Sequence, residues 1–211
     1  MELEFDWATD RWTDPLTGTD VVKISPDERL HFRNPYFRVN MFTHDGRTTV
    51  LCAQDPSGEL KNTLWRVDLV TGESDRLLVY DGKSLASWAV APGSRTVHAI
   101  ERCHERCHIW SVDLDTGEKS CVEVSEPGVA PSYAECSCDG RYIFAHTALR
   151  STPPGMSSHD RIALMGTQPG RNQLSRIDLA DGSAEVLYET DDWWIGHTNP
   201  NPVDPDLFMC C

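Results

Sequence analysis

Trp65-Arg66-Val67-Asp68-Leu69-Val70-Thr71-Gly72-Glu73 is one copy of a pattern that this chain repeats. The pattern returns as Trp110-Ser111-Val112-Asp113-Leu114-Asp115-Thr116-Gly117-Glu118, and again as Ser175-Arg176-Ile177-Asp178-Leu179-Ala180-Asp181-Gly182-Ser183. Each copy is an alternating strand that ends in a tight polar turn. The aspartates at 68, 113 and 178 are 45 and then 65 residues apart, and the longer interval carries an extra loop of about 20 residues. A motif that returns in phase predicts a repeat architecture.

Each copy lies within a larger unit that is also repeated. An inner strand, a turn and a short apolar strand come before the motif, and another strand follows it. The strands are expected at residues 39–43, 48–53 and 75–80 of the first unit, 87–91, 96–100 and 119–124 of the second, and 133–137, 142–146 and 184–188 of the third. Every unit therefore has four antiparallel strands in about 45 residues, which is typical of propeller blades.

The predicted fold class is all-β, a β-propeller with about three complete four-stranded blades and the start of a fourth. Residues 1–35 are expected to be an N-terminal lead-in and residues 36–211 a partial propeller. Its blades are expected at about 36–82, 83–128 and 129–190, with the next one starting at 191–211. Because propellers commonly close with four to eight blades, we expect an open part of a longer protein with almost no helix. A β-sandwich is the alternative, but it gives no reason for one motif to repeat in phase.

Charge and composition limit the possible partners. Lys and Arg number 19 against 33 Asp and Glu, so the formal net charge is −14, which opposes non-specific binding to nucleic acid or anionic lipid. No apolar run approaches the roughly 20 residues that cross a bilayer, and residues 1–6 do not resemble an export signal. We expect a cytoplasmic protein whose eight cysteines are mostly reduced thiols. The sequence leaves the oligomeric state open.

One histidine occupies a distinctive place in the repeat. His197 lies seven residues before the Asp204 turn, where the other units have Arg38, Ala86 and Ser132. This register places His197 at the mouth of the central channel. In antiparallel blades, the long loop at 149–172 overhangs the same face, and loops on one end of a rigid scaffold commonly carry function. The basic residues of that loop are Arg150, His159, Arg161 and Arg171.

The segment around this histidine also carries a resemblance. Trp193-Trp194-Ile195-Gly196-His197-Thr198-Asn199-Pro200-Asn201-Pro202-Val203-Asp204-Pro205-Asp206, the Arg33-Asn34 segment and the turn motif Leu-x-Thr-Gly follow one another along residues 14–211. Together they resemble the N-terminal portion of the oligogalacturonate lyases, which are intracellular seven-bladed propellers. The resemblance implies a lyase in pectin degradation that cleaves short galacturonate oligomers by β-elimination. It implies a small anionic substrate and no nucleic-acid or membrane partner.

The resemblance implies catalytic roles for two residues. β-Elimination needs a base for the C5 proton, which lies α to a carboxylate, and a positive group that neutralises the enolate. His197 would be the base, and a neutral imidazole suits that role. Arg171, matched by its distance ahead of Asp178, would bind the carboxylate through two hydrogen bonds. From position alone, His197 as a capping residue and Arg171 as a solvated loop residue remain the alternatives.

The resemblance also implies substrate contacts from Trp194, Arg33 and Asn34. Aromatic faces pack on sugar rings, but side chains alternate along a strand, so only one of Trp193 and Trp194 can face the channel. The other is expected in the core. Packing of the entry turn is the plainer interpretation of the Arg33-Asn34 segment.

In the oligogalacturonate lyases, a divalent metal, typically manganese, is held by several histidines and one glutamine. It helps to polarise the substrate carboxylate. None of those ligand motifs has a match in residues 1–211, so we expect no metal ligand in this chain. Two other functions stay open, which are a non-catalytic propeller that only binds its ligand and the propeller domain of a larger hydrolase.

Overall fold

The computed structural model describes residues 10–35, 39–54, 63–79, 85–103, 106–126, 129, 131, 133–148, 155–167 and 170–210. Its antiparallel sheets follow one another along the chain. We call the first pair of strands the N-terminal hairpin and the later sheets blades 1 to 4. The hairpin is β1 (Arg11–Thr13) and β2 (Asp20–Val22); blade 1 is β3 (His31–Arg33), β4 (Thr48–Gln54), β5 (Thr63–Asp68) and β6 (Ser74–Val79); blade 2 is β7 (Leu85–Val90), β8 (Thr96–Cys103), β9 (Arg106–Asp113) and β10 (Lys119–Glu123); blade 3 is β11 (Tyr142–Ala148), β12 (Asn172–Asp178) and β13 (Ala184–Thr190); blade 4 is β14 (Thr198–Pro200) and β15 (Phe208–Cys210).

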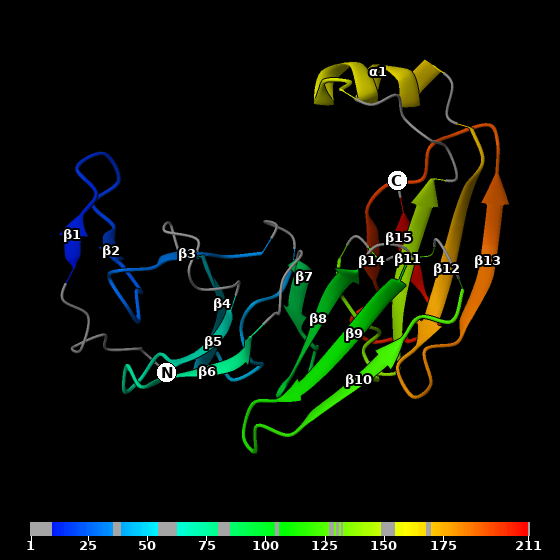
Figure 1. Ribbon diagram of the computed structural model, residues 1–211. Helices are drawn as coiled ribbons and strands as arrows, with labels where there is room; N and C mark the ends of the chain where they lie inside the picture. Colours follow the sequence, from blue (N-terminus) through cyan, green and yellow to red (C-terminus); the bar gives the residue numbers. More distant parts are fainter. Residues whose placement is uncertain are drawn as a thin grey trace.

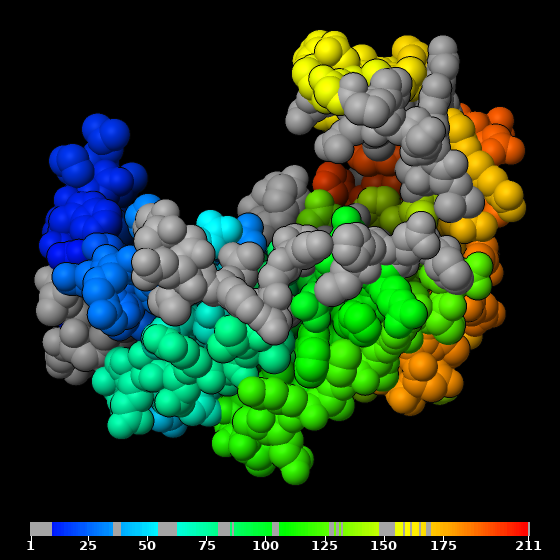
Figure 2. Space-filling view, viewed as in Figure 1, coloured from blue at the N-terminus to red at the C-terminus, as the bar shows by residue number. Residues whose placement is uncertain are grey.

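The sheets stand side by side around an arc, and the two ends of the arc lie far apart (Figure 1). The space-filling view shows the concave side open between the N-terminal hairpin and helix α1 (Ser158–Thr167) (Figure 2). Within blades 1 and 2, each strand pairs with the next one in sequence. The predicted all-β propeller architecture is therefore confirmed.

The turn that defines the repeat has the same hydrogen bonds in each blade. After β5, the Gly72 N–H donates to the Asp68 carbonyl (2.9 Å), and the Asp68 N–H donates to the residue that follows the glycine (2.9 Å). The same two bonds close the turns at Asp113 and Asp178. They also close the turn at Asp14, within the segment where the sequence predicts only a lead-in. The N-terminal hairpin thus has the structure of the outer two strands of a blade.

The inner strands differ from the prediction in two of the three units. β7 confirms the inner strand expected at 87–91. At 39–43 and 133–137, the structure has isolated bridges at Phe42 and Cys136 instead of continuous strands. In blade 1, β3 takes the innermost place and pairs with β4, although it lies before residue 36, where the predicted propeller begins.

Asn40 explains why the inner strand of blade 1 is interrupted. Its Nδ2 donates to the carbonyls of Phe42 (2.8 Å) and Val90 (3.1 Å), and its Oδ1 accepts the Phe42 N–H (3.1 Å). Such local side-chain bonds compete with a regular ladder and turn the backbone. The bond to Val90 also ties blade 1 to blade 2.

The hydrophobic core lies between neighbouring blades. Between blades 1 and 2, the fully buried members of the core include Val50, Leu64, Trp88, Val97 and Val112. Between blades 2 and 3, they include Ile100, Ile109, Ile143 and Ile177. Burying one such side chain contributes about 1.5–3 kcal/mol. The contact between blades therefore supplies the main stabilising energy, beside a smaller apolar cluster within blade 1 that consists of Leu30, Ala53 and Trp65.

The long loop of blade 3 contains a helix that the sequence analysis misses. Helix α1 begins where the Ser157 Oγ accepts the Asp160 N–H (3.1 Å) and donates to the Asp160 carboxylate (2.6 Å). This Ser-x-x-Asp arrangement is a helix capping signal that the sequence does contain. The expectation of almost no helix is wrong for this segment. Arg150, in the same loop, lies outside the described residues.

Five cysteines stand as free thiols in the part of the chain that the structure describes, which are Cys52, Cys121, Cys136, Cys138 and Cys210. Burial raises the pKa of the Cys136 thiol to about 12, so this sulfur packs as an apolar group. Among the residues that the structure describes, no helix is long and apolar enough to span a membrane.

Gly182→Ala is expected to destabilise the chain far more than Gly117→Ala. Both glycines close repeat turns with positive φ, +76° and +73°. A Cβ at Gly182 would overlap the Glu123 carbonyl of blade 2, whereas a Cβ at Gly117 meets nothing within 4 Å. Urea unfolding should show a loss of about 1 kcal/mol for Gly117→Ala and at least about 2 kcal/mol more for Gly182→Ala. Equal losses would contradict this packing of blade 3 on blade 2.

Stability is expected to fall below pH 6.5 because of His98 in β8. This side chain is 4% exposed, its Nδ1 lies 2.9 Å from the Ser111 Oγ, and burial lowers its pKa to about 4. Between pH 6.5 and about 4, the unfolded chain binds a proton that the folded chain does not, so stability falls as pH falls. The loss should be about 2 kcal/mol from pH 7.5 to pH 5. His98→Gln should lose correspondingly less in urea unfolding over the same range, and identical losses would refute the assignment.

Candidate functional site

One edge of blade 3 gathers the segments that the sequence analysis singles out. Ala148 at the end of β11 pairs with Asn172 at the start of β12, and Asn172 pairs with Thr190 at the end of β13. Arg171, directly before β12, and His197, in the segment that leads from β13 into β14, therefore lie on the same edge. We call this edge of the arc the rim. The structure places both predicted catalytic residues on it.

His197 lies where the chain enters the innermost strand of blade 4. It directly precedes β14, and its φ of +31° falls in a region that residues other than glycine rarely adopt. Its half-buried ring lies 6.2 Å, between centroids, from the ring of Tyr133 in blade 3. Ile195, two residues earlier, is 4% exposed and anchors the turn. The surrounding structure therefore holds this imidazole in a strained conformation, which is typical of functional sites.

Other residues occupy the place of His197 in the earlier units. Arg38 and Ser132 lie outside the described residues, and so does the side chain of Ala86.

Arg171 is held by a partner on the outer strand of its blade. Its Nη2 donates to the Glu189 Oε2 (2.8 Å), and the same oxygen accepts Gln173 Nε2 (2.7 Å). The hydrogen bond to Glu189 raises the pKa of Arg171, and the hydrogen bond from Arg171 lowers the pKa of Glu189. β12 is two strands out from the innermost position, about 10 Å at 4.8 Å per strand. The guanidinium is thus charged and exposed, and it would have to leave Glu189 to reach a ligand near the axis.

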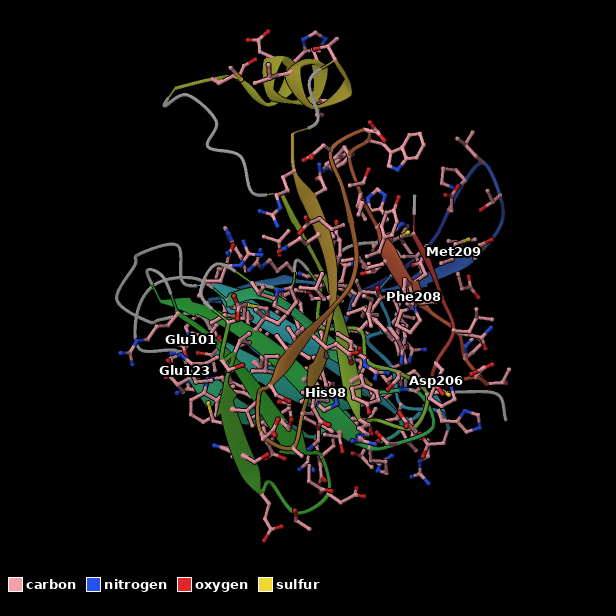
Figure 3. All side chains as sticks on the ribbon, turned by 90° about the vertical axis from the view of Figure 1, so that its right-hand side faces the viewer. His98, Glu101, Glu123, Asp206, Phe208 and Met209 are labelled. Carbon is pink, nitrogen blue, oxygen red and sulfur yellow. The ribbon has the colours of Figure 1, made fainter. Side chains whose placement is uncertain are left out.

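Blade 2 contains an equivalent of this ion pair. Arg106 begins β9, as Arg171 precedes β12, and its Nη1 lies 3.4 Å from the Glu123 Oε2 on the outer strand β10. Glu101 and Glu123 lie near each other in blade 2 (Figure 3), and both are register partners of His108. An arginine paired with an outer-strand glutamate therefore occurs at equivalent positions of blades 2 and 3. This repetition favours a structural contribution from Arg171, beside any role in catalysis.

Neither of the paired tryptophans is buried in the core. Trp193 is 61% exposed and Trp194 is 37% exposed. Trp193 Nε1 donates to the Tyr188 hydroxyl (3.4 Å) on β13. The expectation that one tryptophan is buried is wrong, because Ile195 fills the core at this place. Trp194 remains available on the rim as a surface for a sugar ring.

Arg33 and Asn34 lie in blade 1, away from His197 in blade 4. Arg33 ends β3 and places its guanidinium 5.4 Å from the ring centroid of Trp88, a cation–π contact. Trp88 is buried and donates its Nε1 to the Val50 carbonyl (3.0 Å). Asn34 follows β3 and is exposed. Arg33 therefore stabilises the contact between blades 1 and 2, and the structure does not bring it together with the rim residues of blade 3.

The sequence analysis misses other polar groups in blade 3. Tyr133 is the aromatic neighbour of His197, and both Glu135 and His146 bury polar side-chain atoms, Oε2 and Nδ1. His146 pairs in register with Leu174, two residues from the rim position of Asn172. Alternating polar residues in the strand predicted at 133–137, and the histidine that ends the strand predicted at 142–146, were the available signal. These residues add titratable groups to the blade beside His197.

A divalent metal does not fit the residues that the structure describes. Within them, no group of three or more His, Cys, Asp or Glu side chains is arranged to hold a metal ion. His197 stands next to an aromatic ring, and Arg171 is a cation. The rim of blade 3 can offer a base and a positive charge to a ligand, but it does not offer a ligand set for manganese.

The arc and its rim define a class of protein, an open β-propeller that presents an imidazole and a guanidinium on one edge. No protein-family model matches the chain. It is similar to the oligogalacturonate lyase of Dickeya dadantii (strain 3937), with 22% identity over 214 residues that cover 100% of this chain and 52% of the relative. The chain thus spans about half the length of that relative.

The solved structures agree on the fold. The chain is similar to an oligogalacturonate lyase in complex with manganese, with a TM-score of 0.74 and 20% identity over 96% of this chain and 52% of the other. TolB from Acinetobacter baumannii gives a TM-score of 0.55 and 15% identity over 89% of this chain and 39% of its own. The resemblance to oligogalacturonate lyases is confirmed, and the propeller fold is shared more widely.

Proposed function

We propose that this chain is part of an oligogalacturonide lyase that cleaves short galacturonate oligomers by β-elimination. The observation that carries the proposal is His197, a strained, half-buried histidine at the entrance to an innermost strand, on the same rim as Arg171. The similarity to oligogalacturonate lyases along the whole chain supports it. Because the chain spans about half of such a relative, the activity belongs to the proposal.

The reaction requires one base and one cation. A ring nitrogen of His197 takes the C5 proton, which lies α to the sugar carboxylate. The electron pair of that C–H bond forms the C4–C5 double bond, and the C4–O bond to the next sugar breaks. The leaving oxygen takes a proton from water and becomes a hydroxyl group, and the protonated His197 returns its proton to the solvent. The described residues do not provide a site for manganese.

Arg171 would stabilise the negative charge that develops on the carboxylate. A guanidinium can donate two parallel hydrogen bonds to a carboxylate. Glu189 now occupies that place, so a substrate carboxylate would exchange with a protein carboxylate of the same charge. With a net charge of −14, the chain needs such a local cation to bind an anionic sugar at all. The exposed indole of Trp194 on the same rim would pack against the sugar ring.

We also infer a cytoplasmic location. The described free cysteines are typical of proteins in a reducing compartment. The partner would be a small anionic oligosaccharide, and the acidic surface disfavours nucleic acid and anionic membranes.

A second candidate is a propeller that binds its ligand without turning it over. The Arg106–Glu123 pair of blade 2 favours this function, because it shows that the Arg171–Glu189 arrangement also arises as part of the scaffold. Such a protein would bind the sugar at the rim and would not depend on His197 as a base. Measuring turnover and binding on the same samples separates the two candidates.

His197→Ala is expected to abolish lyase activity, while His159→Ala leaves it unchanged. A full-length version of the protein is incubated with digalacturonate and manganese, and the ultraviolet absorbance of the unsaturated product is followed. Losing a general base should slow the reaction by about 10²–10⁴-fold. His159 lies on α1 with its side chain 94% exposed, so its replacement controls for the loss of an imidazole. Full activity in His197→Ala would exclude the assigned role, and saturable binding without product by the native chain would support the second candidate.

Arg171→Ala is expected to slow turnover by about 10²–10³-fold, whereas Arg106→Ala should have no effect on turnover. The two variants remove equivalent arginine–glutamate pairs from neighbouring blades, so their effects on stability should be similar. Turnover and urea unfolding are measured for both. Equal turnover in the two variants would assign Arg171 a structural role only.

A further inference from the structure

Tyr133 of blade 3 lies beside His197. It stands between β10 and β11 in the chain, and its ring centroid is 6.2 Å from that of His197, with the ring planes tilted by 33°. Aromatic rings at such a separation attract each other. The contact joins two segments that are far apart in the sequence and that belong to neighbouring blades. The imidazole at the entrance to β14 therefore has a ring partner from outside its own segment.

The segment that carries Tyr133 is held on both sides. Ala134 and Cys136, which follow the tyrosine, are buried in the core between blades 2 and 3. Two residues before it, the Pro131 carbonyl accepts a hydrogen bond from the Arg102 Nη2 (2.9 Å) near the end of β8. The tyrosine ring is half-buried and packs against the same core. Blade 2 and blade 3 together therefore fix the position of this ring.

The backbone of His197 is fixed as well, but a fixed backbone does not set the plane of its ring. Ile195 and Thr198, on either side of the histidine, are buried, and Thr198 pairs with Cys210 in blade 4. The second side-chain torsion of a histidine is broad, because the bond joins a tetrahedral carbon to a planar ring. The neighbouring ring of Tyr133 restricts rotation about this bond.

The orientation of the ring is important for a base. Proton transfer needs a ring nitrogen within about 2.6–3.2 Å of the atom that carries the proton. An error of about 1 Å in such a position can slow a reaction by about 10²-fold. A base on an irregular segment therefore depends on a neighbour that holds its ring.

We propose that Tyr133 is a positioning residue of the site, and that its ring holds the His197 imidazole in the orientation that proton abstraction requires. The inference rests on the proposed function, in which His197 is the base. Tyr133 acts through His197, so it needs no contact with the sugar. Because the contact is between two rings, the aromatic ring of the tyrosine carries the effect and its hydroxyl group is not required.

The proposal gives blade 2 a part in the site. Arg102 of blade 2 binds the Pro131 carbonyl, the segment after Pro131 places Tyr133, and Tyr133 orients His197 at the start of blade 4. Blades 2, 3 and 4 follow one another around the arc (Figure 1). The base is therefore positioned by the joints between three consecutive blades and not by a single loop.

Four variants of a full-length version of the protein test the proposal. Tyr133→Leu and Tyr133→Met remove the ring, and the flexible methionine fills the space if leucine is not tolerated. Tyr133→Phe keeps the ring and removes the hydroxyl group. Tyr142→Leu is the control, because Tyr142 is also half-buried but begins β11, at the end of the blade opposite the rim. The ring of Tyr142 contacts the guanidinium groups of Arg141 and Arg176, which lie 4.7 and 4.8 Å from its centroid.

Turnover of digalacturonate separates positioning from a general effect on the fold. Tyr133→Leu and Tyr133→Met should lower kcat at least about tenfold and leave KM unchanged, because the base is displaced while sugar binding is not. Tyr133→Phe and Tyr142→Leu should keep the native kcat. Urea unfolding of the same samples shows whether each variant is folded. A native kcat without the ring, or an equal loss of kcat in Tyr133→Phe, would overturn the proposal.

A spectroscopic test of the same contact does not depend on activity. The ring-proton resonances of His197 are those that His197→Ala removes from the magnetic-resonance spectrum of a sample with labelled histidine. Because a neighbouring aromatic ring displaces such a resonance, it should move in Tyr133→Leu and stay in place in Tyr142→Leu. An unmoved resonance in Tyr133→Leu would also overturn the proposal.

The two assays distinguish this inference from the proposed function on which it rests. Full activity in His197→Ala would refute the proposed function itself. An inactive His197→Ala, beside a Tyr133→Leu with native kcat, would refute only the positioning role of Tyr133.

Discussion

An aspartate carboxylate that accepts backbone N–H groups closes the outer hairpin of the blades. At Asp113, hydrogen bonds from the Thr116 and Asp115 N–H groups lower the pKa of the carboxyl and hold it ionised. Gly117 supplies the positive φ that completes the turn at little steric cost. Because the turn sets the register of two strands, it decides which side chains face each neighbouring blade. The core between the blades forms only when this register is correct.

The repeated turn explains why the architecture could be predicted from the sequence. Asp68, Asp113 and Asp178 mark equivalent points, and the strands around them follow from alternation and from turn residues. The interruption at Asn40 could be predicted only in part, because the side chain bonds both to nearby Phe42 and to Val90, which is 50 residues away in the chain. The capping signal of α1 is present in the sequence but short, and the expected absence of helices concealed it.

The candidate site could be predicted only in part. The sequence places His197 and Arg171 on one edge because strand order decides which loops share a rim. It does not reveal that Glu189 holds the guanidinium, since that contact depends on side-chain geometry across two strands. The sequence also does not reveal that Ile195 is buried while both tryptophans stay exposed, because this depends on how an irregular segment packs. A stretch with no regular strand does not alternate strictly, so the rule that divides Trp193 from Trp194 does not apply there.

Repetition provides a criterion for separating scaffold from function. An arrangement that returns at equivalent positions, such as the arginine paired with an outer-strand glutamate in blades 2 and 3, is explained by the scaffold. His197 has no histidine counterpart in the other units, and its backbone is the one described non-glycine case of positive φ. The blade repeat does not require a positive φ at this position, so the backbone strain at His197 is not explained by the scaffold. His197 is therefore a stronger functional candidate than Arg171. A catalytic role for Arg171 requires that its replacement slows turnover while replacement of Arg106 does not.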